Sequence, residues 1–267
     1  MPIPGSLRDR LGITHAAPAG GGCIHECYRT SAGFLKTNKP GFADAFAAEA
    51  DGLEALRRAG LRAPAPLAHG VEEDRAFLLM ELLDLSPRGD FAALGRMLAH
   101  AHRIPGPRFG WQRDNYIGAT PQQNGWSDSW ADFWWTRRMA PQLALATEKG
   151  FVLKAPPLEL LQQHEPQPSL LHGDLWSGNV GFTRDGPAVF DPAVYYGDRE
   201  ADLAMTELFG GFPPAFYAAY DEAFPRDEGY ARRKPLYNLY HLLNHLNLFG
   251  GGYLAQVQET LRLLLRG

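Results

Sequence analysis

Short stretches rich in apolar side chains dominate the first 80 residues of the chain. Turn-forming residues such as Gly, Pro, Asn and Asp separate these stretches from one another. Apolar runs of this length, bounded by turn residues, are typical of β-strands. The pattern predicts five strands, at residues 13–18, 24–31, 33–38, 66–71 and 75–80.

One segment between the third and fourth predicted strands has a helical period instead. Residues 42–58 form an apolar face at about 100° per residue, made by Phe42, Phe46, Leu53 and Leu56. Glu49 lies inside this face, whereas the other carboxylates of the segment lie opposite it. Because burying an unpaired charge costs several kcal/mol, Glu49 needs a cationic partner. Lys36, near the end of the third predicted strand, is the candidate.

From about residue 86 onward, apolar positions recur mostly at helical spacing. Helices are predicted at residues 91–102, 128–149 and 156–164, and after residue 201 where Gly and Pro interrupt them. Residues 106–125 are rich in Gly, Pro and Asn and are expected to form a long ordered loop. The pattern therefore predicts an α+β fold with a small antiparallel-sheet lobe, one main helix in that lobe, and a larger, mostly helical lobe.

The most informative motif is His172–Asn179, read HGDLWSGN, which Asp191 follows twelve residues after the asparagine. An aspartate, a later asparagine and a second aspartate in this spacing are typical of kinase-like phosphoryl transfer. In that arrangement Asp174 is the catalytic base, and Asn179 and Asp191 bind Mg²⁺. Residues 180–190 are predicted to form a β-hairpin with its turn at 184–187, which would return Asp191 to the side of Asn179.

The first third of the chain supplies the rest of a nucleotide site. Three adjacent glycines at residues 20–22 leave the backbone free to approach phosphate oxygens, although the ending of a P-loop is missing. Lys36 and Glu49 match the lysine–glutamate pair that positions phosphates in kinases. We therefore expect ATP to contact Gly21, Gly22, Lys36 with Glu49 behind it, and the backbone of Glu81 and Leu83.

Length and composition agree with a globular enzyme of two lobes. The chain has 267 residues, of which 45% are hydrophobic and 21% are charged, and this length exceeds the usual size of a single core. We place a nucleotide-binding lobe at residues 1–83 and a catalytic and substrate-binding lobe at residues 84–267. The hinge is expected at about residues 81–86.

Charge and hydropathy argue against several other classes of protein. The net charge of −4 disfavours non-specific binding to nucleic acid or to anionic membranes. No run of about 18 uninterrupted apolar residues predicts a transmembrane helix, and the first residues do not resemble a signal peptide. We therefore expect a cytoplasmic protein without nucleic-acid or membrane partners.

The chain resembles the fructosamine kinase family, a branch of the protein-kinase-like fold that also includes aminoglycoside and choline kinases. The broad fold is indicated by Lys36, Glu49, the loop 172–179 and Asp191. The narrower family is indicated by segments without a general kinase role, together with a tryptophan that aminoglycoside kinases typically lack; these are residues 109–118, 121–126, 191–205, 207–212 and 239–250, and Trp176.

This resemblance implies an ATP- and Mg²⁺-dependent kinase that phosphorylates a sugar hydroxyl of a ketosamine, the product of a sugar and an amine. Fructosamines, ribulosamines and erythrulosamines, free or formed on protein lysines, are the implied substrates. A kinase of the same fold that acts on another amine-bearing alcohol, such as an aminoglycoside, remains the alternative. A catalytically dead binding module is disfavoured because the base and both metal ligands are present. We expect a monomer and leave a dimer open.

Other residues are candidates for the substrate side. The Trp176 indole suits a sugar face or an ammonium group, with plain core packing as the alternative. Asp198 or Glu200 would attract the substrate amine, whereas Asp202 would fix the loop through hydrogen bonds.

Two further motifs have alternative interpretations. Cys23, beside the glycine turn, is either a redox switch of ATP binding or a small buried residue. With Cys27 it makes only two cysteines, too few for a disulfide framework. His241 and His245 lie one helical turn apart but lack the third ligand of a zinc site, so we expect them on a cleft-facing or solvated side.

Overall fold

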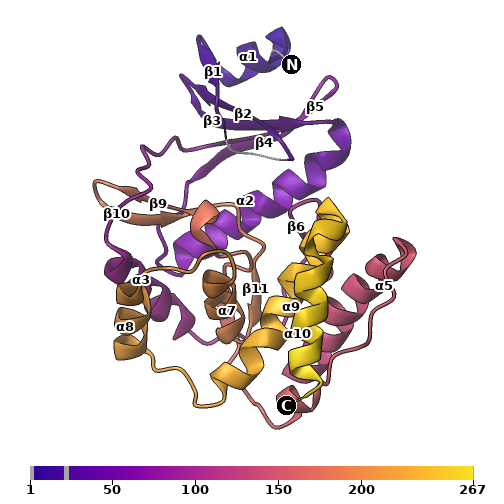
Figure 1. Cartoon of the computed structure of the whole chain (residues 1–267). Coiled ribbons are helices and arrows are strands. Elements are labelled where there is room, and N and C mark those ends of the chain that lie inside the picture. Colours follow the sequence, from indigo (N-terminus) through magenta and orange to yellow (C-terminus); the bar gives the residue numbers. More distant parts are fainter. Residues whose placement is uncertain (1–2, 21–23, 267) are drawn as a thin grey trace.

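A five-stranded antiparallel sheet forms one end of the protein in the computed structural model, which describes residues 3–20 and 24–266 (Figure 1). In spatial order the strands are β1 (Ala16–Pro18), β2 (Glu26–Thr30), β3 (Gly33–Asn38), β5 (Arg75–Met80) and β4 (Pro66–Glu72). The five predicted strands are confirmed, with later starts for β1 and β2. The predictions for Gly21, Gly22 and Cys23 lie outside the described residues.

Both faces of this sheet are covered by helices. The main helix α2 (Ala43–Arg58) packs its apolar face on Leu78 and Met80 of β5. On the opposite face, Leu7 of α1 (Gly5–Leu11) joins Phe77 and Leu79. Successive side chains of β5 therefore point alternately into two hydrophobic cores, one on each face of the sheet. This explains why the sequence of β5 is continuously apolar. Helix α1 was not predicted, because Leu7 is its single buried residue and gives no helical period.

The remaining helices form the larger part of the protein, below the sheet and α2 in Figure 1. They are α3 (Phe91–His102), α4 (Trp130–Phe133), α5 (Ala140–Glu148), α6 (Glu159–Gln162), α7 (Glu200–Leu208), α8 (Pro214–Ala223), α9 (Tyr230–Phe249) and α10 (Leu254–Leu264). The α+β class and the mostly helical second part are confirmed. None of the helices within the described residues is both long and apolar enough to cross a membrane.

The predicted helix at 128–149 is interrupted by a π-helical turn at Trp134–Met139. Pro141 follows this turn and has no N–H to donate to the preceding turn, which favours the change of hydrogen-bond register. The predicted helix at 156–164 is shorter, because α6 covers only Glu159–Gln162 in the middle of that range.

Three pairs of short strands complete the described part of the fold. The predicted hairpin is confirmed as β9 (Val180–Thr183) and β10 (Gly186–Val189), although the turn is shorter than expected. Strand β8 (Ser169–Leu171) pairs with β11 (Tyr195–Gly197). The expected loop at 106–125 was partly wrong, because β6 (Asn115–Ile117) and β7 (Thr120–Gln122) form a hairpin within it. Strands of three residues are too short to show a period.

The connection between β5 and α3 contains the predicted hinge at 81–86. Strand β5 ends at Met80, and α3 begins at Phe91. Ser86 pairs with Phe182 of β9 through two backbone hydrogen bonds of 2.8 and 2.9 Å. These bonds attach the end of the connection to the β9–β10 hairpin. The division into lobes at residues 83 and 84 stays a prediction.

Candidate active site

A cavity of about 730 Å³ lies between the sheet and the helical part. The strand side and the connection after β5 contribute Lys36, Glu49, Glu81 and Leu83, and the helical side contributes Asp174, Trp176, Asn179 and Asp191. These residues come from positions up to 155 apart in the sequence. The fold thus brings together the predicted site residues that it describes, with the exception of Asp198 and Glu200.

Lys36 lies at the centre of the cavity end that we expect to bind phosphate (the phosphate end). Its Nζ lies 2.6 Å from Glu49 Oε1 and 2.6 Å from Asp191 Oδ1, and the residue is only 6% exposed. Burial alone would lower the pKa of Lys36, but Asp191 and Glu49 outweigh burial and raise it. Lys36 therefore stays cationic, and the ion pair that the position of Glu49 predicted is confirmed.

Asn179 and Asp191 present oxygen atoms that suit Mg²⁺. The Asn179 amide nitrogen donates to the Asp174 carbonyl at 2.8 Å and to Asp174 Oδ2 at 3.1 Å, so its Oδ1 points elsewhere. Among the described residues no group donates to Asn179 Oδ1 or to the second oxygen of Asp191. An amide oxygen and a carboxylate oxygen are ligands that Mg²⁺ prefers, so the residues fit this ion.

Asp174 has the properties of a general base. Burial and the nearby charge of Asp191 raise the pKa of Asp174 to about 7, against the lowering effect of the Asn179 hydrogen bond. A base is most effective when its pKa lies near the working pH. The carboxyl group is therefore suited to accept a proton from a substrate hydroxyl at neutral pH.

Asp202 fixes the backbone of the loop at residues 172–179, the predicted catalytic loop, as expected. Asp202 Oδ2 accepts from the His172 N–H at 2.7 Å, and Oδ1 accepts from the Gly173 N–H at 2.9 Å. Gly173 has φ +83°, and a Cβ there would lie 2.1 Å from the Ala193 carbonyl oxygen, so a side chain is excluded. The His102 Nε2 lies 3.3 Å from Asp202 Oδ2 and helps to hold this carboxylate in place. No pattern in the sequence indicated His102.

The other end of the cavity is formed by the catalytic loop, β6 and α9. Trp176 is half-buried and lines the cavity together with Tyr116, Asn244 and His245. The His245 Nδ1 lies 2.8 Å from the His241 carbonyl and therefore carries a proton, which leaves Nε2 as an acceptor in the neutral ring. Burial lowers the pKa of His245, in agreement with a neutral ring.

The two histidines of α9 thus have different surroundings. The cleft-facing position is confirmed for His245, whereas His241 is buried with an exposure of 4%. Cys27 also lines the cavity, and burial raises the pKa of its thiol, so it is not an activated thiolate.

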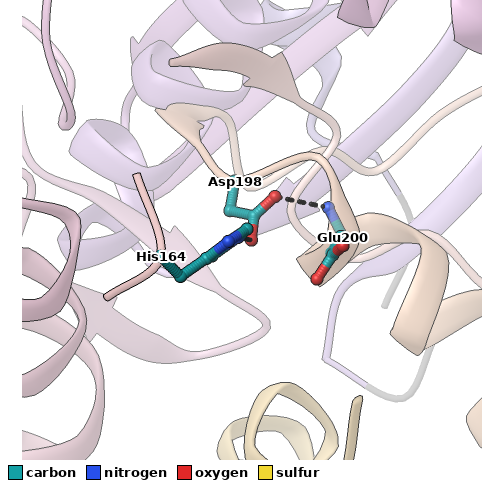
Figure 2. A group of neighbouring side chains, drawn as sticks. All are labelled: His164, Asp198 and Glu200. Carbon is teal, nitrogen blue, oxygen red and sulfur yellow. Dashed lines mark hydrogen bonds and ion pairs between the residues drawn. The ribbon is translucent and has the colours of Figure 1, made fainter. Parts of the chain in front are cut away.

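Asp198 and Glu200 were predicted to attract the substrate amine, but the structure places neither in the cavity lining. Both are 1% exposed and belong to a buried network (Figure 2). Asp198 accepts from Tyr237 and lies 2.7 Å from His164 Nε2, and Glu200 accepts two hydrogen bonds of 2.8 Å from Arg233.

Ligand-type atoms of His164, Asp198 and Glu200 lie within 4.8 Å of one another. The Arg233 guanidinium already neutralises Glu200, so this cluster is a buried ion network between α7 and α9. The sequence pattern did not reveal the network, because Arg233 lies 33 residues beyond Glu200.

The segment before β6 holds α2 from the side of the helical part. The Trp111 indole N–H donates to Asp51 Oδ2 at 2.7 Å, and Arg113 pairs with Asp44 at 2.6 Å. Glu49 lies on α2 between these two aspartates. This segment is one of those by which the chain resembles the fructosamine kinase family and not kinases in general. It positions α2, the helix that presents Glu49 to Lys36.

We expect Trp111→Phe to raise the KM for ATP about two- to fivefold with a smaller change in kcat. The variant loses a hydrogen bond to a carboxylate, worth about 1.5–3 kcal/mol when fully formed, and only part of that loss reaches the nucleotide through α2. Steady-state kinetics at varied ATP concentration measure the effect. Trp126→Phe is the matched control, because Trp126 is 38% exposed. Equal effects in both variants would contradict a role for the Asp51 contact.

Comparisons with known proteins agree with this geometry. A sequence profile of the family described as fructosamine kinase matches residues 4–267. A probable ketoamine kinase of Synechocystis sp. is 47% identical over 262 residues, which cover 92% of this chain and 88% of that protein. The chloroplastic protein-ribulosamine 3-kinase of Arabidopsis thaliana is 40% identical over 275 residues, covering 94% and 84%.

Solved structures show the same relationship. A Haemophilus somnus 129PT protein assigned as a fructosamine-3-kinase has a TM-score of 0.88 and 32% identity, with 97% of this chain and 95% of that chain covered. An aminoglycoside phosphotransferase, with a TM-score of 0.61 and 17% identity over 97% and 96% of the chains, shares the fold. The protein-kinase-like fold is thereby confirmed, and the chain belongs to the fructosamine kinase family.

Proposed function

We propose that the protein is an ATP- and Mg²⁺-dependent kinase that phosphorylates a sugar hydroxyl of a ketosamine. The observation that carries this proposal is the shared cavity of Lys36, Asp174, Asn179 and Asp191. The printed names of the relatives, ketoamine kinase and ribulosamine 3-kinase, support the acceptor class.

The residues divide the work of phosphoryl transfer. Lys36 binds phosphate oxygens, and Asp174 orients the acceptor hydroxyl and receives its proton. Asn179 and Asp191 hold Mg²⁺, which neutralises charge on the phosphates when bound.

The Glu81 N–H already donates to the Ala65 carbonyl at 2.8 Å, so the adenine ring would meet the backbone after β5 through two other groups. The Glu81 carbonyl is available as an acceptor. The Leu83 N–H has no partner among the described residues and is available as a donor. The Glu81 carboxylate is held by Arg62 at 2.5 and 2.8 Å, which fixes this part of the connection.

The charge of the cavity favours a ketosamine over an aminoglycoside. Within the described residues its acidic side chains are Glu49, Glu81, Asp174 and Asp191. Glu49 and Asp191 face Lys36, and Glu81 faces Arg62. Of these four described carboxylates, only Asp174 has no cationic partner, which suits an acceptor with a single ammonium group and not a polycation.

A substrate panel tests this assignment. With MgATP, we expect turnover of ribulosamine or fructosamine and at least about 100-fold lower kcat/KM for aminoglycosides, a difference of about 2.7 kcal/mol. The free ketose without its amine is the matched control and should have a higher KM. Turnover of aminoglycosides alone would overturn the ketosamine assignment while leaving the kinase fold unaffected.

Trp176→Ala is expected to raise the KM for a ketosamine about tenfold with little change in ATP affinity. The indole face would contact the sugar or the ammonium group, and a partly desolvated cation–π contact is worth about 1–2 kcal/mol. Kinetics and nucleotide titration separate the two effects. If ATP affinity and thermal stability fall together with ketosamine turnover, Trp176 is a packing residue. The choice between free and protein-bound ketosamines, the cytoplasmic location and the monomeric state stay predictions.

A further inference from the structure

His25 lines the phosphate end of the cavity, and the division of roles above gives it no function. It precedes Cys27 by two residues, and Cys27 lies opposite Lys36 in the β2–β3 pair. The ring rests on α2 and the turn before it, with centroids 4.8 Å from Phe46 and 5.4 Å from Phe42. The charges of Lys36 and Asp191 both act on it. His25 is therefore held near the groups expected to bind phosphate and metal.

The orientation of the neighbouring Asn38 side chain is fixed by two backbone groups. Its Oδ1 accepts from the Lys39 N–H at 2.8 Å, and its Nδ2 donates to the Ile24 carbonyl at 2.9 Å. If the amide were rotated by half a turn, its Nδ2 would face the Lys39 N–H and its Oδ1 would face the Ile24 carbonyl. Neither hydrogen bond could then form. The atom 2.9 Å from His25 Nδ1 is therefore the amide nitrogen.

This contact determines the tautomer of His25. Because the Asn38 Nδ2 donates, the His25 Nδ1 accepts, and the single proton of the neutral ring is on Nε2. A protonated ring would place two donors against each other. Within residues 3–20 and 24–266 the Nε2–H has no acceptor, and Nε2 is not among the enclosed unpaired atoms, so it remains accessible.

We propose that the His25 Nε2–H donates a hydrogen bond to a phosphate oxygen of bound ATP. A neutral donor adds a directed hydrogen bond beside Lys36 without repelling its charge. The ring packing on Phe42 and Phe46 fixes the direction of this N–H before the nucleotide binds. The inference rests on the proposed function only in that the cavity binds ATP.

Two substitutions distinguish the hydrogen bond from ring packing. The amide nitrogen of Gln can reach the position of Nε2, whereas that of Asn reaches only the position of Nδ1. We expect His25→Asn to raise the Kd of MgATP about tenfold, as for loss of a hydrogen bond to a charged group. His25→Gln should stay within about twofold of the wild type, and adenosine affinity should change less than about twofold in both variants. Calorimetric titration at pH 7.5 measures these constants.

Unchanged MgATP affinity in His25→Asn would overturn the inference. So would equal losses of MgATP and adenosine affinity in both variants together with lower melting temperatures, because packing would then explain them. Ketosamine turnover by the wild type is measured separately. A wild type that binds MgATP but phosphorylates no ketosamine refutes the proposed function, while the titrations still decide the role of His25. A wild type that binds no MgATP overturns both.

Discussion

Asp174→Asn is expected to lower kcat for ketosamine phosphorylation about 10²- to 10⁴-fold, the usual contribution of a general base. The amide keeps the shape of the side chain and can still accept from Asn179, which lies 3.1 Å away. MgATP affinity should therefore change by less than about threefold. Single-turnover kinetics and nucleotide titration measure the two quantities. Retained turnover would show that another group accepts the proton.

The same variant should be more stable than the wild type without nucleotide and Mg²⁺. Because the folded pKa of Asp174 is raised from 3.8 to about 7, the folded state binds the proton more tightly than the unfolded state. The wild type therefore loses stability as pH rises from about 4 to about 7, and the full cost is present above pH 7. Asn has no such charge.

Melting temperatures in EDTA at pH 5 and pH 8 test this expectation. We expect the melting temperature of Asp174→Asn to exceed that of the wild type by more at pH 8 than at pH 5. An equal gain at both pH values would mean that burial and Asp191 do not raise the pKa of Asp174.

Glu200→Ala is expected to lower the free energy of unfolding by about 3–5 kcal/mol. It removes both hydrogen bonds that Glu200 accepts from Arg233 and leaves the guanidinium, whose side chain is 9% exposed, with Asp227 as its remaining partner. For a chain of this size that corresponds to roughly 6–20 °C in melting temperature. Thermal and denaturant unfolding provide the measurement.

An exposed ion pair is the matched control for this change. Glu259 pairs with Arg262 on α10, and both side chains are more than half exposed. Glu259→Ala should therefore cost less than about 1 kcal/mol. The double variant Glu200→Met with Arg233→Met should recover much of the loss, since a buried pair is often replaceable by apolar residues. A loss in Glu200→Ala no larger than that in Glu259→Ala would contradict the importance of the network.

The parts of the fold that the sequence predicted well have strong local patterns. Helix α2 has a full apolar face, and the single carboxylate inside that face, Glu49, identified its partner Lys36 across 13 residues. The hairpin spacing predicted that Asp191 returns to the side of Asn179, and the structure places it 2.6 Å from Lys36, 155 residues away in the sequence. For Glu49, a polar group inside an apolar face needed a specific partner, which limits the number of arrangements.

Other features depend on contacts that leave no local pattern. Helix α1 buries one side chain, and β6 and β7 have three residues each, too few to define a period. The positions of Asp198 and Glu200 are set by partners on α9 and in the loop after α6. A short acidic stretch looks the same whether it faces a ligand or, as here, a buried arginine.

The most direct test of the proposed function is ³¹P NMR of a reaction containing the protein, MgATP and ribulosamine. The proposal predicts one new phosphate ester on the sugar for each ADP formed, and at least about 100-fold slower ester formation with Asp174→Asn. ADP formation with inorganic phosphate alone, or an ester formed only when an aminoglycoside replaces the ketosamine, would contradict it.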